Sequence, residues 1–252
     1  MKTITSTGFY EISRQGEIAI VRVKKNVFDF ITDMKLTGDL MDFIDNIHQD
    51  TQIKALLYYN EPDSFSDEEY NKFLNHIMVD PSETGQSILP CYTERNTRAR
   101  EINYLNEIIK KLSQLHIFVI AGIQGTVVTP YIGTAMAADF RYACEGSMFS
   151  MAHNKYGLHP SGGLPFFLTR LLNHSQALDI MSREYITAKE ALDLGMITKI
   201  LQKDEFIDQM ILEIKKITKP KYCTIQHTKR LLNYSRKSLF DYFDYEGKIL
   251  NL

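Results

Sequence analysis

Hydrophobic positions change their period several times along the chain, and each change predicts a different element. Near the N-terminus, residues 8–13 and 17–24 alternate between apolar and polar, which predicts two strands joined by a tight turn. Residues 32–48 then place apolar side chains at helical spacing, with Thr32 as the expected N-cap. A β-type apolar run over residues 53–59 follows. This opening third is therefore predicted to contain a β-α-β unit.

Two more helices and a long loop are predicted before the centre of the chain. Residues 66–78 begin with Ser66 as a cap and three acidic residues, which is a favourable helix start. Residues 97–115 carry apolar side chains on one face and predict an amphipathic helix. Between them, residues 79–96 contain prolines, a glycine and several Ser and Thr residues. They predict a long mobile loop, either a lid beside an active site or a surface insertion.

The central segment has the order strand, turn, tightly packed helix, strand. An apolar run at residues 117–123 precedes a glycine-containing turn, a small-residue helix at 132–138 and a second strand at 140–144. A helix entered through such a turn presents unpaired backbone N–H groups and a partial positive charge. These groups can hold a carbonyl oxygen that becomes an oxyanion during a reaction.

Strand-helix alternation continues to residue 200 and predicts stacked β-α-β turns rather than an antiparallel sandwich. Beyond it, the pattern predicts three helices without intervening strands, over residues 204–217, 220–233 and 238–250. The expected organisation is thus a core over residues 1–200 and a helical oligomerisation region over residues 201–252.

Composition excludes several classes of protein. The 252 residues have a net charge of -2, which does not support nucleic acid as the main partner. No apolar run approaches the roughly 20 residues that span a bilayer, and the first residues do not resemble a signal peptide. The three cysteines are far apart and lack metal-ligand spacing, so reduced thiols in the cytoplasm are expected. No spacing of His, Asp or Glu predicts a metal site.

Several of these segments together resemble the crotonase superfamily (enoyl-CoA hydratase/isomerase-like proteins). The matching features are residues 117–125, 135–139 leading into 140–143, Phe149, Gly157, the turn at 160–163 and the stretch at 187–195. The resemblance extends over most of the chain. It implies an α/β fold, a spiral of β-β-α units, whose C-terminal helices pack over the site and build homotrimers, often paired into hexamers.

The resemblance also implies a way of binding substrate. The family polarises a thioester carbonyl with two backbone N–H groups, and the first falls at Asp67, within an acidic helix start. The second falls at Pro130, which has no N–H, so Tyr131 or Ile132 is expected to supply it after a small shift. Losing one such donor usually adds about 3–4 kcal/mol to the barrier.

The family's hydratases use two glutamates, and neither is present here. Gly133 aligns with one and His153 with the other. Two carboxylates suit hydration because one activates water while the other moves a proton to carbon. Gly133 can do neither, whereas His153 can exchange a proton near neutral pH. Tyr156 and His159 are the expected assistants of His153.

The sequence therefore predicts an enzyme that acts on an acyl thioester through an enolate-type intermediate. Isomerisation, decarboxylation or another lyase step is expected rather than standard hydration. The acyl carrier would be coenzyme A or the phosphopantetheine of an acyl-carrier protein, bound as part of the substrate and not as a tight cofactor. Lys24 and Lys25 are candidates for its phosphates. Two alternatives stay open: a catalytically inactive binding or assembly protein, and a histidine-based hydrolase.

Overall fold

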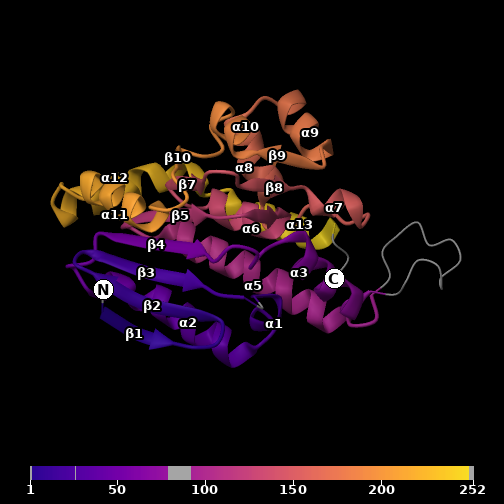
Figure 1. The fold of residues 1–252 in the computed structure, drawn as a ribbon, viewed down its shortest axis with the longest axis horizontal. Helices are drawn as coiled ribbons and strands as arrows, with labels where there is room; N and C mark the ends of the chain where they lie inside the picture. Colours follow the sequence, from indigo (N-terminus) through magenta and orange to yellow (C-terminus); the bar gives the residue numbers. More distant parts are fainter. Residues whose placement is uncertain (1, 26, 79–91, 250–252) are drawn as a thin grey trace, which may run out of the picture.

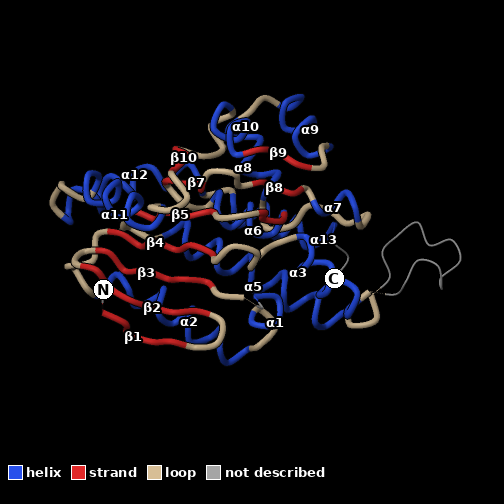
Figure 2. The backbone as a smooth tube through the Cα atoms, in the orientation of Figure 1, coloured by secondary structure: helices blue, strands red, loops and turns tan. Residues whose placement is uncertain are grey.

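The protein is described by a computed structural model that covers residues 2–25, 27–78 and 92–249. Within these residues the strands form a seven-stranded and a three-stranded sheet. In spatial order, the larger sheet contains β1 (Lys2–Ser6), β2 (Tyr10–Gln15), β3 (Ile18–Val23), β4 (Ala55–Asn60), β5 (Phe118–Ile123), β7 (Phe140–Cys144) and β10 (Lys199–Leu201). The smaller sheet contains β6 (Thr126–Val128), β8 (Met148–Ser150) and β9 (Tyr185–Thr187). Figure 2 shows the strands of the larger sheet side by side.

Helices occupy most of the connections between strands. The first half contains α1 (Val27–Phe30), α2 (Met34–Asn46), α3 (Asp67–Ile77) and α5 (Arg95–Gln114). The second half contains α6 (Thr129–Met136), α7 (Ala152–Lys155), α8 (Leu164–Leu171), α9 (His174–Ser182) and α10 (Ala188–Asp193). The C-terminal region contains α11 (Phe206–Ile217), α12 (Tyr222–Asn233), the short 3-10 helix η2 (Tyr234–Arg236) and α13 (Leu239–Ile249).

The connectivity is the β-β-α spiral that the family resemblance implies. Strands β3, β4, β5, β7 and β10 run parallel to one another, while β1, β2 and β3 pair antiparallel. The chain crosses to the smaller sheet between β5 and β7 and again between β7 and β10. Figure 1 shows the smaller sheet with α8, α9 and α10 on one side of the molecule, away from β1 to β3. Because parallel strands end at the same edge of a sheet, this arrangement brings several loops together there.

Each face of the larger sheet is covered by helices. Side chains such as Val21, Leu56 and Val119 face a large core that also contains residues of α2, α5 and α6. The opposite face packs on α11 through a second core, where Met210 lies against Gly122. A Cβ at Gly122 would lie 2.6 Å from the Met210 sulfur, so only glycine permits this close approach.

Most predicted elements are confirmed, with corrections at their ends. The strand at 140–144 has the predicted bounds, but β1 escaped prediction because its residues are exposed and carry no clear apolar alternation. The predicted cap Thr32 is wrong: Asp33 caps α2 and accepts from the N–H groups of Lys35 and Leu36. Ser66 caps α3 as predicted.

The loop predicted over residues 79–96 ends before residue 96, because a helix begins within that range. Residues 79–91 lie outside the described residues. Met78 and Tyr92 pair in an isolated β-bridge, and α5 already begins at Arg95. A lid at this position stays a prediction.

Some bulk expectations can be compared with the described residues. None of the described helices combines the length and apolar character needed to cross a membrane. Within the same residues no group of three potential metal ligands lies together. Cys144 and Cys223 are free thiols, while Cys91 lies outside the described residues.

Candidate functional site

The N-termini of α3 and α6 lie side by side at the carboxyl edge of the larger sheet. The N–H of Val128, which precedes α6, donates to the carbonyl oxygen of Phe65, which precedes α3, over 3.0 Å. The rings of Phe65 and Tyr131 stack with their centroids 4.0 Å apart. A main-chain hydrogen bond and a ring contact therefore hold together the two helix ends that the resemblance assigns to the oxyanion donors. The first-turn N–H groups of each helix have no partner within it.

Asp67 is the first residue of α3, and its carboxylate is held by neighbours from the smaller sheet. Ser150 donates its hydroxyl to one carboxylate oxygen over 2.6 Å, and the Tyr185 hydroxyl donates to the other over 3.2 Å. A carboxylate beside a forming oxyanion would oppose it by like charge. The two hydrogen bonds hold the carboxylate of Asp67 against Ser150 and Tyr185. Its main-chain N–H can therefore act as a donor independently of the side chain.

Pro130 lies in the first turn of α6, which begins at Thr129, three residues before the helix predicted at 132–138. Proline suits a helix start because the first turn does not need its N–H. Tyr131 follows it and is 2% exposed, with its hydroxyl donating to the carbonyl of Gly122 over 3.0 Å. Burial raises the pKa of this hydroxyl well above its ordinary value, so Tyr131 stays neutral. The nearest available main-chain donor after Pro130 thus belongs to a rigidly held residue.

His153 lies on α7 and is 6% exposed. Its Nδ1 is 2.9 Å from the hydroxyl of Thr129, which also contacts the carbonyl oxygen of Ser150 at 3.3 Å. Burial lowers the pKa of His153, and a backbone hydrogen bond of Met181 opposes that shift. The imidazole is therefore neutral near pH 7, which suits a group that accepts a proton. Thr129 begins α6, so His153 is held by the first residue of that helix.

Gly133 cannot be replaced by any larger residue in this backbone. A Cβ at Gly133 would lie 2.0 Å from the carbonyl oxygen of Gly162. Gly162 has a φ of 73°, and a Cβ there would lie 3.1 Å from the carbonyl oxygen of Pro130. The turn before α8 therefore occupies the space that the family's first glutamate would need.

The other candidate residues are dispersed. Tyr156 packs its ring edge-on against Tyr70, with centroids 6.0 Å apart, and its buried hydroxyl has no hydrogen-bond partner among the described residues. His159 is exposed. The Lys24 ammonium donates to the Thr7 carbonyl over 2.6 Å and to the Ser6 hydroxyl, whereas Lys25 is exposed and faces the cleft at Asp67.

Two clefts open at Asp67 and share Tyr185 as a wall. The larger has a volume of about 570 Å³ and the smaller about 300 Å³. The larger cleft is acidic, because Asp63, Asp67, Glu68 and Glu69 line it with Lys25. Lys72 pairs with Glu68 and Glu69 and offsets part of that charge. His153 and Tyr131 form no part of the wall of either cleft.

The C-terminal helix reaches the turn below the site. The Glu246 carboxylate accepts from the N–H of Gly163 over 3.1 Å, and the Phe243 ring lies where a Cβ of Gly163 would point. Burial raises the pKa of Glu246 to about 7, although hydrogen bonds from Tyr242 and the turn and the charge of Arg98 oppose the shift. Sequence reasoning missed Glu246 and Thr129. Glu246 occupies one polar position in an ordinary amphipathic helix, while Thr129 could have been suspected from its place beside Pro130.

Glu246 predicts a pH dependence of stability. Its folded pKa of about 7 lies above the ordinary 4.5, so its contribution is fully present below pH 4.5 and is lost as pH rises through 7. The loss is about 3 kcal/mol, at 1.36 kcal/mol per pKa unit. Glu246→Gln should remove this slope and unfold at higher denaturant concentration than the unaltered protein at pH 8. Equal slopes for the two proteins would contradict it, and Glu107→Gln on the exposed face of α5 is the control.

Comparisons with known proteins identify the family of the chain. The family model for enoyl-CoA hydratase/isomerase matches residues 84–251. A probable enoyl-CoA hydratase of Mycobacterium tuberculosis is 31% identical over 111 residues, 43% of this chain and 39% of that protein. A trans-2-decenoyl-[acyl-carrier-protein] isomerase of Streptococcus mutans is 29% identical over 116 residues, 44% of each chain. The matched stretch thus spans less than half the length of these relatives.

Solved structures show the same fold at lower sequence identity. An enoyl-CoA hydratase from Bacillus halodurans superposes with a TM-score of 0.75 at 18% identity, over 96% of this chain and 94% of that one. An enoyl-CoA hydratase from Geobacillus kaustophilus gives 0.74 at 19% identity, over 99% and 91%. With the family match over two thirds of the sequence, these findings place the chain in the enoyl-CoA hydratase/isomerase family of the crotonase superfamily.

Proposed function

We propose that the protein is an enzyme that binds an acyl thioester and stabilises an enolate-type intermediate, acting as an isomerase or lyase. The carrying observation is the pairing of the α3 and α6 N-termini through Val128 and Phe65, with His153 anchored on Thr129 beside them. Main-chain donors would hold the carbonyl oxygen while neutral His153 moves one proton. Hydration would need a carboxylate at position 133, and the backbone of Gly162 leaves no room for a side chain there.

A non-catalytic acyl-binding or assembly protein is the second candidate. Two observations favour it: Pro130 removes an N–H at the donor position, and His153 is buried and lines neither cleft at Asp67. An enzyme and an acyl-binding protein would both bind an acyl thioester, and only the enzyme would convert it. A binding experiment therefore tests the property that the two candidates share.

The charge around Asp67 bears on the identity of the carrier. Coenzyme A carries phosphates, and four carboxylates against Lys25 and Lys72 would repel them. This supports a substrate whose phosphates lie away from the larger cleft. The phosphate role of Lys24 is unsupported, because its ammonium is engaged by β1 and the following turn.

Thermal shift with two carriers of one acyl group tests this proposal. Crotonyl-CoA and crotonyl-N-acetylcysteamine present the same thioester with and without phosphates. Both should stabilise the protein, by about 2.7 kcal/mol at 100 times the dissociation constant. The coenzyme A ester should gain affinity as salt screens the acidic cleft. If neither ester shifts the melting temperature, acyl-thioester binding is refuted. If the coenzyme A ester binds more weakly at high salt, the proposed repulsion between its phosphates and the acidic cleft is refuted.

We further propose that the C-terminal helices form the oligomer contact. Several large apolar side chains on α12, η2 and α13 are exposed in the single chain: Leu231, Leu232, Tyr234, Tyr245 and Ile249. An apolar surface of this kind on a protein with an ordinary charged exterior is typical of an interface. A homotrimer, or a hexamer of two trimers, is the expected assembly, and a cytoplasmic location remains the prediction.

A further inference from the structure

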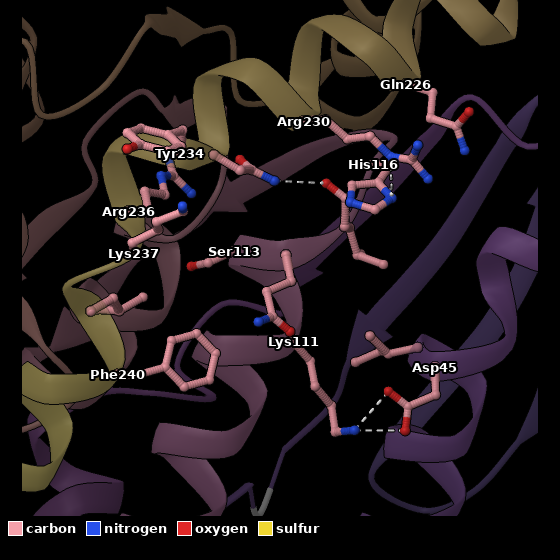
Figure 3. Close-up of a pocket in the computed structure, with 15 residues that line it drawn as sticks. Asp45, Lys111, Ser113, His116, Gln226, Arg230, Tyr234, Arg236, Lys237 and Phe240 are labelled. Atoms are coloured by element: carbon pink, nitrogen blue, oxygen red, sulfur yellow. Dashed lines mark hydrogen bonds and ion pairs between the residues drawn. The ribbon is translucent and has the colours of Figure 1, made fainter.

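One face of α13 is buried, and it carries a carboxyl group. The buried residues are Leu239, Phe243 and Glu246, whose spacing places them on the same side of the helix. Phe240 follows Leu239, and Figure 3 shows its ring in the wall of a separate cleft between the end of α5 and the corner of α12 and α13. Glu246 is 5% exposed. Burying a carboxyl group is costly unless hydrogen bonds satisfy it, so the contacts of Glu246 indicate its role.

Glu246 holds the turn that leads into α8. Gly163 is the N-cap residue of α8 and has a φ of 68°. The Glu246 carboxylate accepts from the N–H of Gly163 over 3.1 Å, and the N–H of Gly162 also donates to it. A negative group near the N-terminus of a helix is favoured by the helix dipole. The carboxyl group of α13 therefore fixes the main chain of the turn over residues 160–163.

The same helix contacts the turn through a ring. The nearest atom of the Phe243 ring lies 3.1 Å from the position that a Cβ of Gly163 would take. Phe243 and Glu246 lie three residues apart on α13, so they face the turn together. One hydrogen-bonding group and one packed ring thus hold Gly163 from the side of the C-terminal helix.

The turn in its other direction meets α6, main chain against main chain. A Cβ at Gly133 would lie 2.0 Å from the carbonyl oxygen of Gly162, and a Cβ at Gly162 would lie 3.1 Å from the carbonyl oxygen of Pro130. Backbone contacts of this kind cannot adjust by a change of rotamer. A displacement of the turn must therefore either displace the first turn of α6 or open a gap beside it.

We propose that Glu246 is a positioning residue for the oxyanion donors. Through the turn it sets the place of the α6 N-terminus, where the N–H of Tyr131 follows Pro130. Glu246 lines neither cleft at Asp67, so it acts through the turn and not on the substrate. A shift of about 1 Å at a reacting centre can cost about 10²-fold in rate, even when the altered residue lies far from the chemistry. This inference rests on the proposed acyl-thioester function.

Two substitutions of Glu246 separate positioning from simple stability. Glu246→Leu keeps an apolar volume in the buried face but removes the acceptor, and it should lower kcat by about 10- to 100-fold with little change in KM. Glu246→Gln keeps an acceptor oxygen for the N–H of Gly163, so it should retain most of kcat. Asp244→Asn removes a carboxylate from an exposed position of the same helix and is the matched control, with kcat unchanged.

The carbonyl band of a bound thioester, labelled with ¹³C at that carbon, gives a readout that loss of stability alone does not move. In Glu246→Leu the band should return part of the way to its position in water, whereas Glu246→Gln and Asp244→Asn should keep the position seen with the unaltered chain. If Glu246→Leu does not fold, Glu246→Asp takes its place, because the shorter side chain keeps the charge but loses reach toward Gly163.

The outcomes distinguish this inference from the function on which it rests. If the unaltered chain binds and polarises the thioester, and the variant without the acceptor gives the same band and the same kcat, Glu246 does not position the donors and the proposed function stands. Equal losses in Glu246→Leu and Glu246→Gln would also overturn the inference, because the acceptor would then not matter. If the unaltered chain binds no thioester, the proposed function fails, and this inference fails with it.

Discussion

Gly133→Ala is expected to destabilise the protein by about 3 kcal/mol or more, although alanine is the better helix former. In a helix interior, exchange of glycine for alanine normally stabilises by up to about 1 kcal/mol. Here the added Cβ would lie 2.0 Å from the carbonyl oxygen of Gly162, and backbone cannot move aside as a flexible side chain could. Overpacking of this kind displaces neighbouring elements. The turn before α8 would have to move away from α6.

Denaturant unfolding measures the effect, and α2 offers a matched control. Gly38 also lies within a helix, and its Cβ would meet nothing within 4 Å. Gly38→Ala should therefore stabilise the protein. If Gly133→Ala matches Gly38→Ala, the close contact between α6 and the turn does not exist. Restoring the family's carboxylate by Gly133→Glu should cost more than alanine and should not produce hydration.

His153→Ala is expected to lower turnover of an accepted acyl thioester by about 10²- to 10⁴-fold, the usual contribution of a positioned acid or base. Thioester binding should change little, since main-chain donors hold the carbonyl. Steady-state kinetics on the unaltered chain and the variant measure this split between kcat and KM. Turnover at the original rate would remove His153 from the mechanism.

The pH profile separates a chemical role of His153 from a structural one. Burial lowers the pKa of His153 below its ordinary 6.5, so for a base acting in its neutral form kcat should rise with pH through a midpoint below 6.5. Thr129→Val keeps the volume near α6 but removes the Nδ1 partner. It should lower kcat without unfolding the protein. A midpoint above pH 6.5 would argue against His153 as the base.

The fold was predictable because its elements depend on local pattern. The strand at 140–144 and the Ser66 cap follow from apolar runs and capping chemistry that act within a few residues. The C-terminal helices were predictable for the same reason. The exposed β1 was not, because its pairing to β2 leaves little trace in its own side chains.

The candidate site was only partly predictable, because its contacts join distant segments. The family resemblance assigned roles to Asp67, Pro130 and His153, and these residues lie in the first turns of α3 and α6 and on α7. It could not show that Ser150 and Tyr185 hold the Asp67 carboxylate, since those residues come from other strands. Proximity in sequence also misled: Tyr156 and His159 lie near His153 in the chain, yet one packs on Tyr70 and the other is exposed.

Difference infrared spectroscopy tests most directly whether the helix ends polarise a thioester. A thioester labelled with ¹³C at its carbonyl gives a band that moves to lower wavenumber when N–H groups donate to the oxygen. The paired N-termini of α3 and α6 predict such a shift on binding to the unaltered chain and also to His153→Ala, because the donors are main-chain groups. A bound thioester whose carbonyl band stays at its position in water would contradict the account.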